Sequence, residues 1–99
     1  MQLTRSGVYL ARLDPAKGAE VGKLRPVVVL TDQSLLDIKP PHVFVCPLSG
    51  RSDPNYQALH LSLPARDSLK VKSYALVEHC RAISIRRLQS DRLATLEID

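Results

Sequence analysis

Apolar positions in the first half of the chain follow the patterns of β-strands. The segment 7–13 alternates, which predicts a strand with its odd-numbered residues on one face and its even-numbered residues on the other. The segments 26–31 and 42–48 are nearly continuous apolar runs, and the first is rich in β-branched residues, as in buried strands. Pro26 suits the first position of its strand, because proline fixes φ and has no N–H for the ladder.

The second half continues the β pattern. The segment 58–63 alternates strictly, so we expect a half-buried strand whose leucines point inward and whose His60 and Ser62 point outward. The segment 69–84 predicts another strand, or a bent pair of strands, with an apolar centre over 74–77. These short strands, with turn residues between them, indicate a small and strongly curved sheet.

Two short helical elements are predicted beside the strands. The segment 32–37 has the polar start and paired leucines of a helical turn. Ser90 can cap a final helix, with Asp91 in its first turn and with Leu93 and Leu96 turned toward the core. The predicted fold is therefore mainly β with small helical additions.

A loop of about ten residues separates the first two predicted strands, which is longer than a usual hairpin connection and favours a functional role. Gly18 and Gly22 bracket Glu20 and give the loop backbone freedom. Arg25 stands where this loop enters the core, and Pro26 holds it in an extended conformation. A guanidinium at the rim of a rigid sheet, beside a loop with a carboxylate, is typical of a site on a scaffold.

Size and composition limit the class of protein. Ninety-nine residues, 44% of them apolar and 24% charged, predict one globular domain over residues 1–99. No apolar run approaches the roughly 18 residues of a membrane span, and the N-terminus lacks the apolar region of a signal peptide. We therefore expect a cytoplasmic protein with no membrane partner. Cys46 and Cys80 belong to no C-x-x-C pair and are expected to be reduced core thiols.

Charge and motifs narrow the chemistry. The net charge of +4 favours a polyanionic partner. The sequence has no phosphate-binding glycine loop, no H-E-x-x-H and no closely spaced carboxylates for Mg²⁺. A His79–Cys80 nucleophile pair is not favoured, because neighbouring side chains of one strand point to opposite faces. A metal site from Cys46, His60 and His79 is not favoured either, because nothing in their spacing brings the side chains together. We expect no metal and no cofactor.

Several of these segments together resemble a known family. The runs 14–20 and 23–30, with the spacing G-x-E-x(4)-R-P-V-V-V, are similar to the signature of MazF/PemK-type toxins, and the resemblance continues through 43–49, 73–81 and 87–88. These toxins are the ribonuclease halves of bacterial toxin–antitoxin pairs. The resemblance implies an SH3-like barrel with short helical additions, a C-terminal helix among them, and a homodimer. Relatives usually have an acidic residue where this chain has Gly7.

The resemblance also implies an activity. Cleavage of RNA needs no metal, because the ribose 2′-OH is the nucleophile and the protein has to deprotonate it and stabilise the charged phosphorane. Glu20, Arg25 and Ser49 match the family's positions for these tasks, with Glu20 as general base and the other two on the phosphate. The expected products are a 2′,3′-cyclic phosphate and a 5′-hydroxyl. The general acid stays unassigned.

Partners follow from the same reasoning. Single-stranded mRNA is the expected substrate and an acidic, MazE-like antitoxin the expected partner. Tyr56 and Arg51 are candidates for base contacts, since RNA bases stack on aromatic rings and Arg planes; Phe44 is expected in the core. The full set of predicted RNA-binding residues is Lys17, Lys23, Arg51, Tyr56, Glu78 and Arg81. Two alternatives stay open: a CcdB-like toxin of the same fold that poisons DNA gyrase, and a catalytically silent module that binds RNA or an antitoxin.

Overall fold

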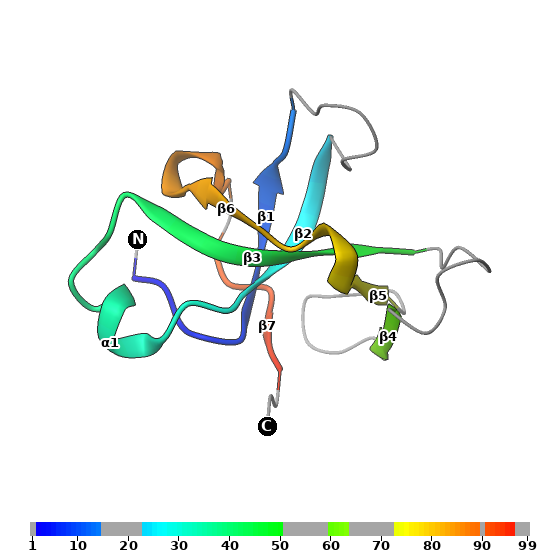
Figure 1. Cartoon of the computed structure of the whole chain (residues 1–99), viewed down its shortest axis with the longest axis horizontal. Coiled ribbons are helices and arrows are strands. Elements are labelled where there is room, and N and C mark those ends of the chain that lie inside the picture. Colours follow the sequence, from blue (N-terminus) through cyan, green and yellow to red (C-terminus); the bar gives the residue numbers. More distant parts are fainter. Residues whose placement is uncertain (1, 15–22, 51–59, 64–72, 90, 97–99) are drawn as a thin grey trace.

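The computed structural model describes residues 2–14, 23–50, 60–63, 73–89 and 91–96. These residues form one curled sheet with short helical turns between its strands (Figure 1). The strands are β1 (Gly7–Arg12), β2 (Leu24–Val29), β3 (His42–Ser49), β4 (His60–Leu63), β5 (Ser73–Leu76), β6 (Arg81–Ser84) and β7 (Ala94–Thr95). The helical turns are α1 (Gln33–Leu36), η2 (Val77–His79) and η3 (Ile85–Arg87).

The longest strand, β3, organises the sheet. The strand order is β4-β5-β3-β2-β1-β7, every pair is antiparallel, and β6 also pairs with β3. The first half of β3 pairs with β6, its middle with β2 and its end with β5. Figure 1 shows β3 crossing β1 and β2 at a steep angle, as expected for a strongly twisted and curled sheet.

Most of the predicted strands are confirmed. β1, β3 and the described part of β4 lie within one residue of the segments that the alternation marks, and β5 and β6 are the bent pair of strands, joined through η2. Pro26 is not the first residue of its strand, because β2 begins at Leu24, opposite the end of β1. Parts of the predicted strands lie outside the described part of the chain. These are Leu59, residues 69–72 and the side chains of residues 60–61.

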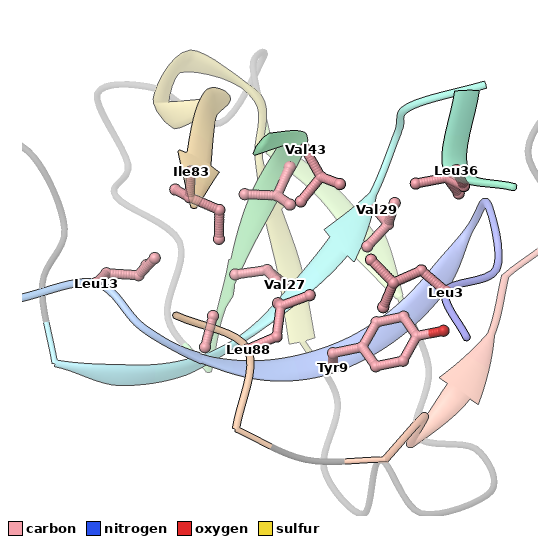
Figure 2. Packing of buried hydrophobic residues seen from close by; sticks show 11 residues of the cluster. Leu3, Tyr9, Leu13, Val27, Val29, Leu36, Val43, Ile83 and Leu88 are labelled. Carbon is pink, nitrogen blue, oxygen red and sulfur yellow. The ribbon is translucent and has the colours of Figure 1, made fainter. Parts of the chain in front are cut away.

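Two core clusters lie on the two faces of the sheet. The odd-numbered side chains of β1 join the first cluster and Val8 joins the second, which confirms the predicted alternation. Figure 2 shows the first cluster, in which side chains of β1, β2, β3 and β6 point toward one another, with Leu36 of α1 at one end and Leu13 at the other. The buried members of the second cluster are Val8, Val28, Cys46, Leu48, Ala75 and Ala94.

The helical turn predicted at 32–37 is confirmed as α1. Asp32 is its N-cap, and its carboxylate accepts hydrogen bonds from the backbone N–H and the hydroxyl of Ser34. Those hydrogen bonds, the hydroxyl first, lower the pKa of Asp32 below its ordinary value. The cap thus fixes where the chain turns after β2.

Within the described ranges, no helix has both the length and the apolar character needed to cross a bilayer.

The predicted C-terminal helix is wrong over the described residues. Ala94 and Thr95 form β7, which pairs with Val8 and Gly7 of β1, and Leu93 N–H donates to the carbonyl of Val8 at 2.7 Å. The spacing of Leu93 and Leu96 suits a helix, yet the outer edge of β1 needs backbone partners, and a strand supplies them. Both leucines still pack against the second core cluster, as expected. Ser90 lies outside the described residues.

The expectation that Phe44 belongs to the core is also wrong. Its side chain is 47% exposed, and the residue opposite it on β6, Ala82, is exposed as well. Phe44 lies on the face of β3 that faces away from the first core cluster, since its neighbours Val43 and Val45 belong to that cluster. The continuous apolar run therefore predicts the strand correctly, but it does not show that both faces of the strand are buried at Phe44.

Gly7 occupies a position with no room for a side chain. An added Cβ would lie 2.8 Å from Cε2 of Tyr9 and 2.9 Å from the carbonyl oxygen of Thr4. The Tyr9 ring cannot move away easily, because it is 1% exposed and its hydroxyl accepts a hydrogen bond from the N–H of Thr4 at 2.9 Å. Glycine at this position is thus required by the packing of Tyr9.

We expect Gly7→Ala to lower the free energy of unfolding by about 1–3 kcal/mol, the usual cost of overpacking a core. Gly50→Ala is the matched control, because Gly50 is exposed and an added Cβ there meets nothing within 4 Å. Urea unfolding of both variants measures the difference. Equal unfolding midpoints for the two variants would contradict the steric account.

Candidate active site

Arg25 lies at the rim of the first core cluster. It is the second residue of β2, it is half-buried, and it pairs with Ala11 of β1. Directly opposite side chains of an antiparallel pair share one face of the sheet. Arg25 therefore stands on the same face as buried Ala11, at the end of β2 that the chain enters from residues 15–22.

Ser49 reaches the same rim from β3. It is the last residue of that strand, it is half-buried, and it pairs with Tyr74 of β5. Val27 of β2 pairs with Pro47 of β3, and this register continued by two residues along both strands leads to Arg25 and Ser49. The guanidinium and the hydroxyl thus belong to neighbouring strands and to one face, as the proposed catalysis requires.

Arg81 adds a second guanidinium to this face. It is the first residue of β6 and pairs with Val45, a member of the first core cluster. Its Nη2 donates to the carbonyl of Leu13 at 3.5 Å, so the side chain reaches across to the end of β1. Arg25 and Arg81 thus bring two guanidinium groups to the same face of the sheet, and guanidinium groups suit phosphate oxygens.

The two ends of the segment 15–22 are fastened beside Arg25. Leu13 N–H donates to the carbonyl of Lys23 at 2.8 Å, and Lys23 N–H donates to Oδ1 of Asp14 at 2.7 Å. Lys23 has a φ of 67°, a conformation that costs a non-glycine residue free energy and that these hydrogen bonds maintain. Its side chain is exposed at the rim.

Arg87 supports the same region from η3, a role that sequence reasoning missed. Its Nη1 donates to the carbonyl of Arg12 at 3.1 Å and to the carbonyl of Asp14 at 2.8 Å. These contacts link residues more than seventy positions apart, so only the folded chain reveals them. Arg87 holds the end of β1 in place and is a positioning residue rather than a catalytic one.

Tyr74 is the second residue that sequence reasoning did not select. It is half-buried and lies between Ser49 and Ser62 in the register of β3, β5 and β4. Its ring therefore comes from the strand next to Ser49. The signal that finds it is strand register, which the sequence alone does not give.

Of the other predicted site residues, Glu78 is described and exposed in η2. Four further residues, Lys17, Glu20, Arg51 and Tyr56, lie outside the described residues, as do Gly18 and Gly22. Among the residues that the structure does describe, no three His, Cys, Asp or Glu side chains gather as they would around a metal ion. The described candidate site residues are thus Arg25, Ser49, Arg81, Lys23, Tyr74 and Glu78.

The curled sheet has the same fold as several solved MazF structures. MazF from Deinococcus radiodurans superposes with a TM-score of 0.80 at 24% identity, over 98% of this chain and 84% of that one. A MazE–MazF structure from the same organism gives 0.72 at 22% identity, over 98% and 83%. The Mycobacterium tuberculosis toxin MazF-mt6 gives 0.71 at 21% identity, over 92% and 80%.

Sequence comparison gives the family. Residues 4–99 match the model of the PemK-like, MazF-like toxins of type II toxin–antitoxin systems, so the chain belongs to this family. One relative, the Endoribonuclease MazF of Staphylococcus saprophyticus, is 31% identical over 88 residues, which are 88% of this chain and 72% of the relative. The resemblance inferred from the residue pattern is confirmed.

Proposed function

We propose that this chain is a metal-independent, sequence-selective endoribonuclease that cleaves single-stranded mRNA and leaves a 2′,3′-cyclic phosphate and a 5′-hydroxyl. The observation that carries the proposal is the register of β2 and β3, which, continued by two residues past Val27 and Pro47, leads to Arg25 and Ser49 at the end of β2 that follows the segment with Glu20. Membership of the PemK/MazF-like toxins and the name of the Staphylococcus relative support it.

In the proposed reaction the ribose 2′-oxygen attacks the adjacent phosphorus while Glu20 takes the 2′-OH proton. The bond from phosphorus to the 5′-oxygen then breaks, and the 5′-oxygen takes up a proton as it leaves. Glu20 is three residues from Lys23, so the chain between their Cα atoms spans at most about 11 Å. Such a positioned base contributes on the order of 10²–10⁴-fold.

Arg25 and Ser49 act on the phosphate in this mechanism. A guanidinium remains protonated in proteins and offers a planar fork of donors to phosphate oxygens, so Arg25 stabilises the extra negative charge of the phosphorane. The Ser49 hydroxyl donates a neutral hydrogen bond to the same group. Both side chains start from strands, which hold them in fixed positions before the substrate arrives.

RNA binding is proposed to extend from this rim. Arg81 contacts the backbone beside the scissile phosphate, and the Tyr74 ring offers a stacking surface for a base next to Ser49. The exposed side chains of Lys23 and Glu78 contribute further contacts. The remaining proposed contacts, Lys17, Arg51 and Tyr56, are inferred from the sequence.

The proposed partner is a MazE-like antitoxin, whose acidic tail competes with RNA for this basic rim. MazE–MazF structures from Deinococcus radiodurans are among those that superpose on this chain, which supports the proposal. We also propose that the toxin works as a homodimer in the cytoplasm, where its mRNA substrate is.

The substrate test uses two matched oligonucleotides in buffer with EDTA, an all-RNA strand and the same strand with single 2′-deoxy substitutions. We expect the all-RNA strand to be cut and the product to carry a cyclic phosphate by mass spectrometry. Each 2′-deoxy substitution at a cut site should abolish cutting there, because the nucleophile is missing. Cleavage that continues at the substituted positions, or that needs added Mg²⁺, would refute the mechanism; binding of gyrase without RNA cleavage would favour a CcdB-like activity.

A further inference from the structure

The two cysteines face each other where the ladder between β3 and β6 stops. Phe44 pairs with Ala82 and Val45 with Arg81, so the next position in this register pairs Cys46 with Cys80. Beyond this point the chain that runs along β3 forms the helical turn η2. The next strand pairing of β3 is with β5, where Leu48 pairs with Ala75. The cysteines are therefore the last facing residues before the interruption.

Their geometry suits a disulfide bond. Directly opposite residues of antiparallel strands have Cα atoms about 4.5–5.5 Å apart, within the range of about 4.4–6.8 Å that disulfides use. Both side chains also lie on the same face, because Cys46 belongs to the second core cluster and Cys80 packs against that cluster. Both are free thiols in this structure.

The surroundings of the two thiols differ. Cys46 is buried, at 4% exposure, and its burial raises the pKa of its thiol to about 12, with further contributions from the neighbouring Cys80 and Glu78 side chains. Cys80 is only half-buried. The continued strand register and the shared core cluster place the two side chains beside each other. The difference in exposure means that an oxidant in solution meets Cys80 first.

We propose that Cys46 and Cys80 are a reversible dithiol–disulfide pair that links β3 to the junction of η2 and β6. With a disulfide such as oxidised glutathione, the Cys80 thiolate attacks one sulfur and releases one glutathione thiol. Cys46 then loses its proton and attacks the Cys80 sulfur, which releases the second glutathione. The protein gives up two electrons and two protons, and the oxidant is reduced to two thiols.

The bond would tie down a segment that carries site residues. Cys80 directly precedes Arg81, and Glu78 lies in the same turn, so a link to β3 restricts how both move relative to the sheet. It would also close the 34 positions from Cys46 to Cys80 into a loop and so constrain the unfolded chain. This inference does not depend on the activity proposed above.

The test is oxidation of the folded, full-length chain with oxidised glutathione, followed by alkylation of free thiols and intact-mass measurement. We expect the mass to fall by two hydrogen atoms, with no alkylation, no attached glutathione and a monomer on a non-reducing gel. Dithiothreitol should restore two alkylatable thiols. Thermal unfolding should show a higher Tm for the oxidised chain than for the reduced one.

Two single variants separate a pair from an isolated reactive thiol. Cys46→Ala should accumulate a lasting glutathione adduct on Cys80, whereas Cys80→Ser should react little, since Cys46 is buried. If Cys46→Ala folds poorly, the parent chain still tests the proposal. A lasting glutathione adduct on Cys80 of the parent chain, with Cys46 still open to alkylation, would overturn the proposal. A disulfide formed only between two chains would overturn it as well.

Discussion

Replacing Arg25 by alanine should lower the rate of RNA cleavage by about 10²–10³-fold, the usual loss when one charge-stabilising donor is removed from an active site. Arg25 is half-buried and lies on the strand next to that of Ser49, and alanine would leave the charge that develops on the phosphorane without the guanidinium donor. Arg25→Lys keeps the charge but loses the planar fork, so its activity should lie between the two. Single-turnover cleavage of a defined oligonucleotide measures all three proteins.

The matched control is Arg12→Ala, one strand away. Arg12 is exposed and pairs with Leu24, so its side chain lies on the opposite face of the sheet from Arg25. The Arg12→Ala substitution removes the same charge from the protein but leaves the proposed phosphate site intact. The RNA cleavage activity of this variant should therefore stay near that of the parent. An equal loss in both variants would mean that net charge, rather than the position of Arg25, accounts for the effect.

Replacing Leu13 by alanine should lower the free energy of unfolding by about 2–5 kcal/mol, the range for a cavity in a closed core. Leu13 is fully buried, at 0% exposure, and lies at the end of the first core cluster below the rim (Figure 2). Small domains have only about 5–15 kcal/mol in total, so this loss is large. Urea unfolding followed by circular dichroism gives the difference.

The control for this change is Leu24→Ala, since Leu24 is 46% exposed in the neighbouring strand. The substitution removes the same atoms, but from a side chain that is about half exposed to water in the folded protein. The loss of unfolding free energy should therefore be well below that of Leu13→Ala. Similar losses in the two variants would show that Leu13 is not closely packed. The carbonyl of Leu13 also accepts a hydrogen bond from Arg81, and its N–H donates one to the carbonyl of Lys23. The Leu13 variant should therefore also lose RNA cleavage activity at temperatures near its Tm.

The sequence predicted most of the strands because alternation and β-branched runs report burial directly. It failed at the C-terminus, where Leu93 and Leu96 can reach the core from a helix or from a strand, and only the open edge of β1 decides between them. It also failed at Phe44, because an apolar run does not tell which face another element covers. Both errors concern tertiary contacts, which local pattern does not encode.

The site was predictable as residues but not as an arrangement. Arg25, Ser49 and Arg81 were selected from the resemblance, and strand register then placed them on one face. Tyr74 and Arg87 were not selected, because their roles arise from strand pairing and from contacts between distant parts of the chain. The predictions for Glu20, Lys17, Arg51 and Tyr56 await measurement of cleavage by their variants.

The close contact between Gly7 and the Tyr9 ring has a consequence for how this toxin can diversify. An added side chain at position 7 meets both the Tyr9 ring and the carbonyl of Thr4, so a smaller residue at position 9 relieves only part of the cost, and the effects of the two substitutions are not additive.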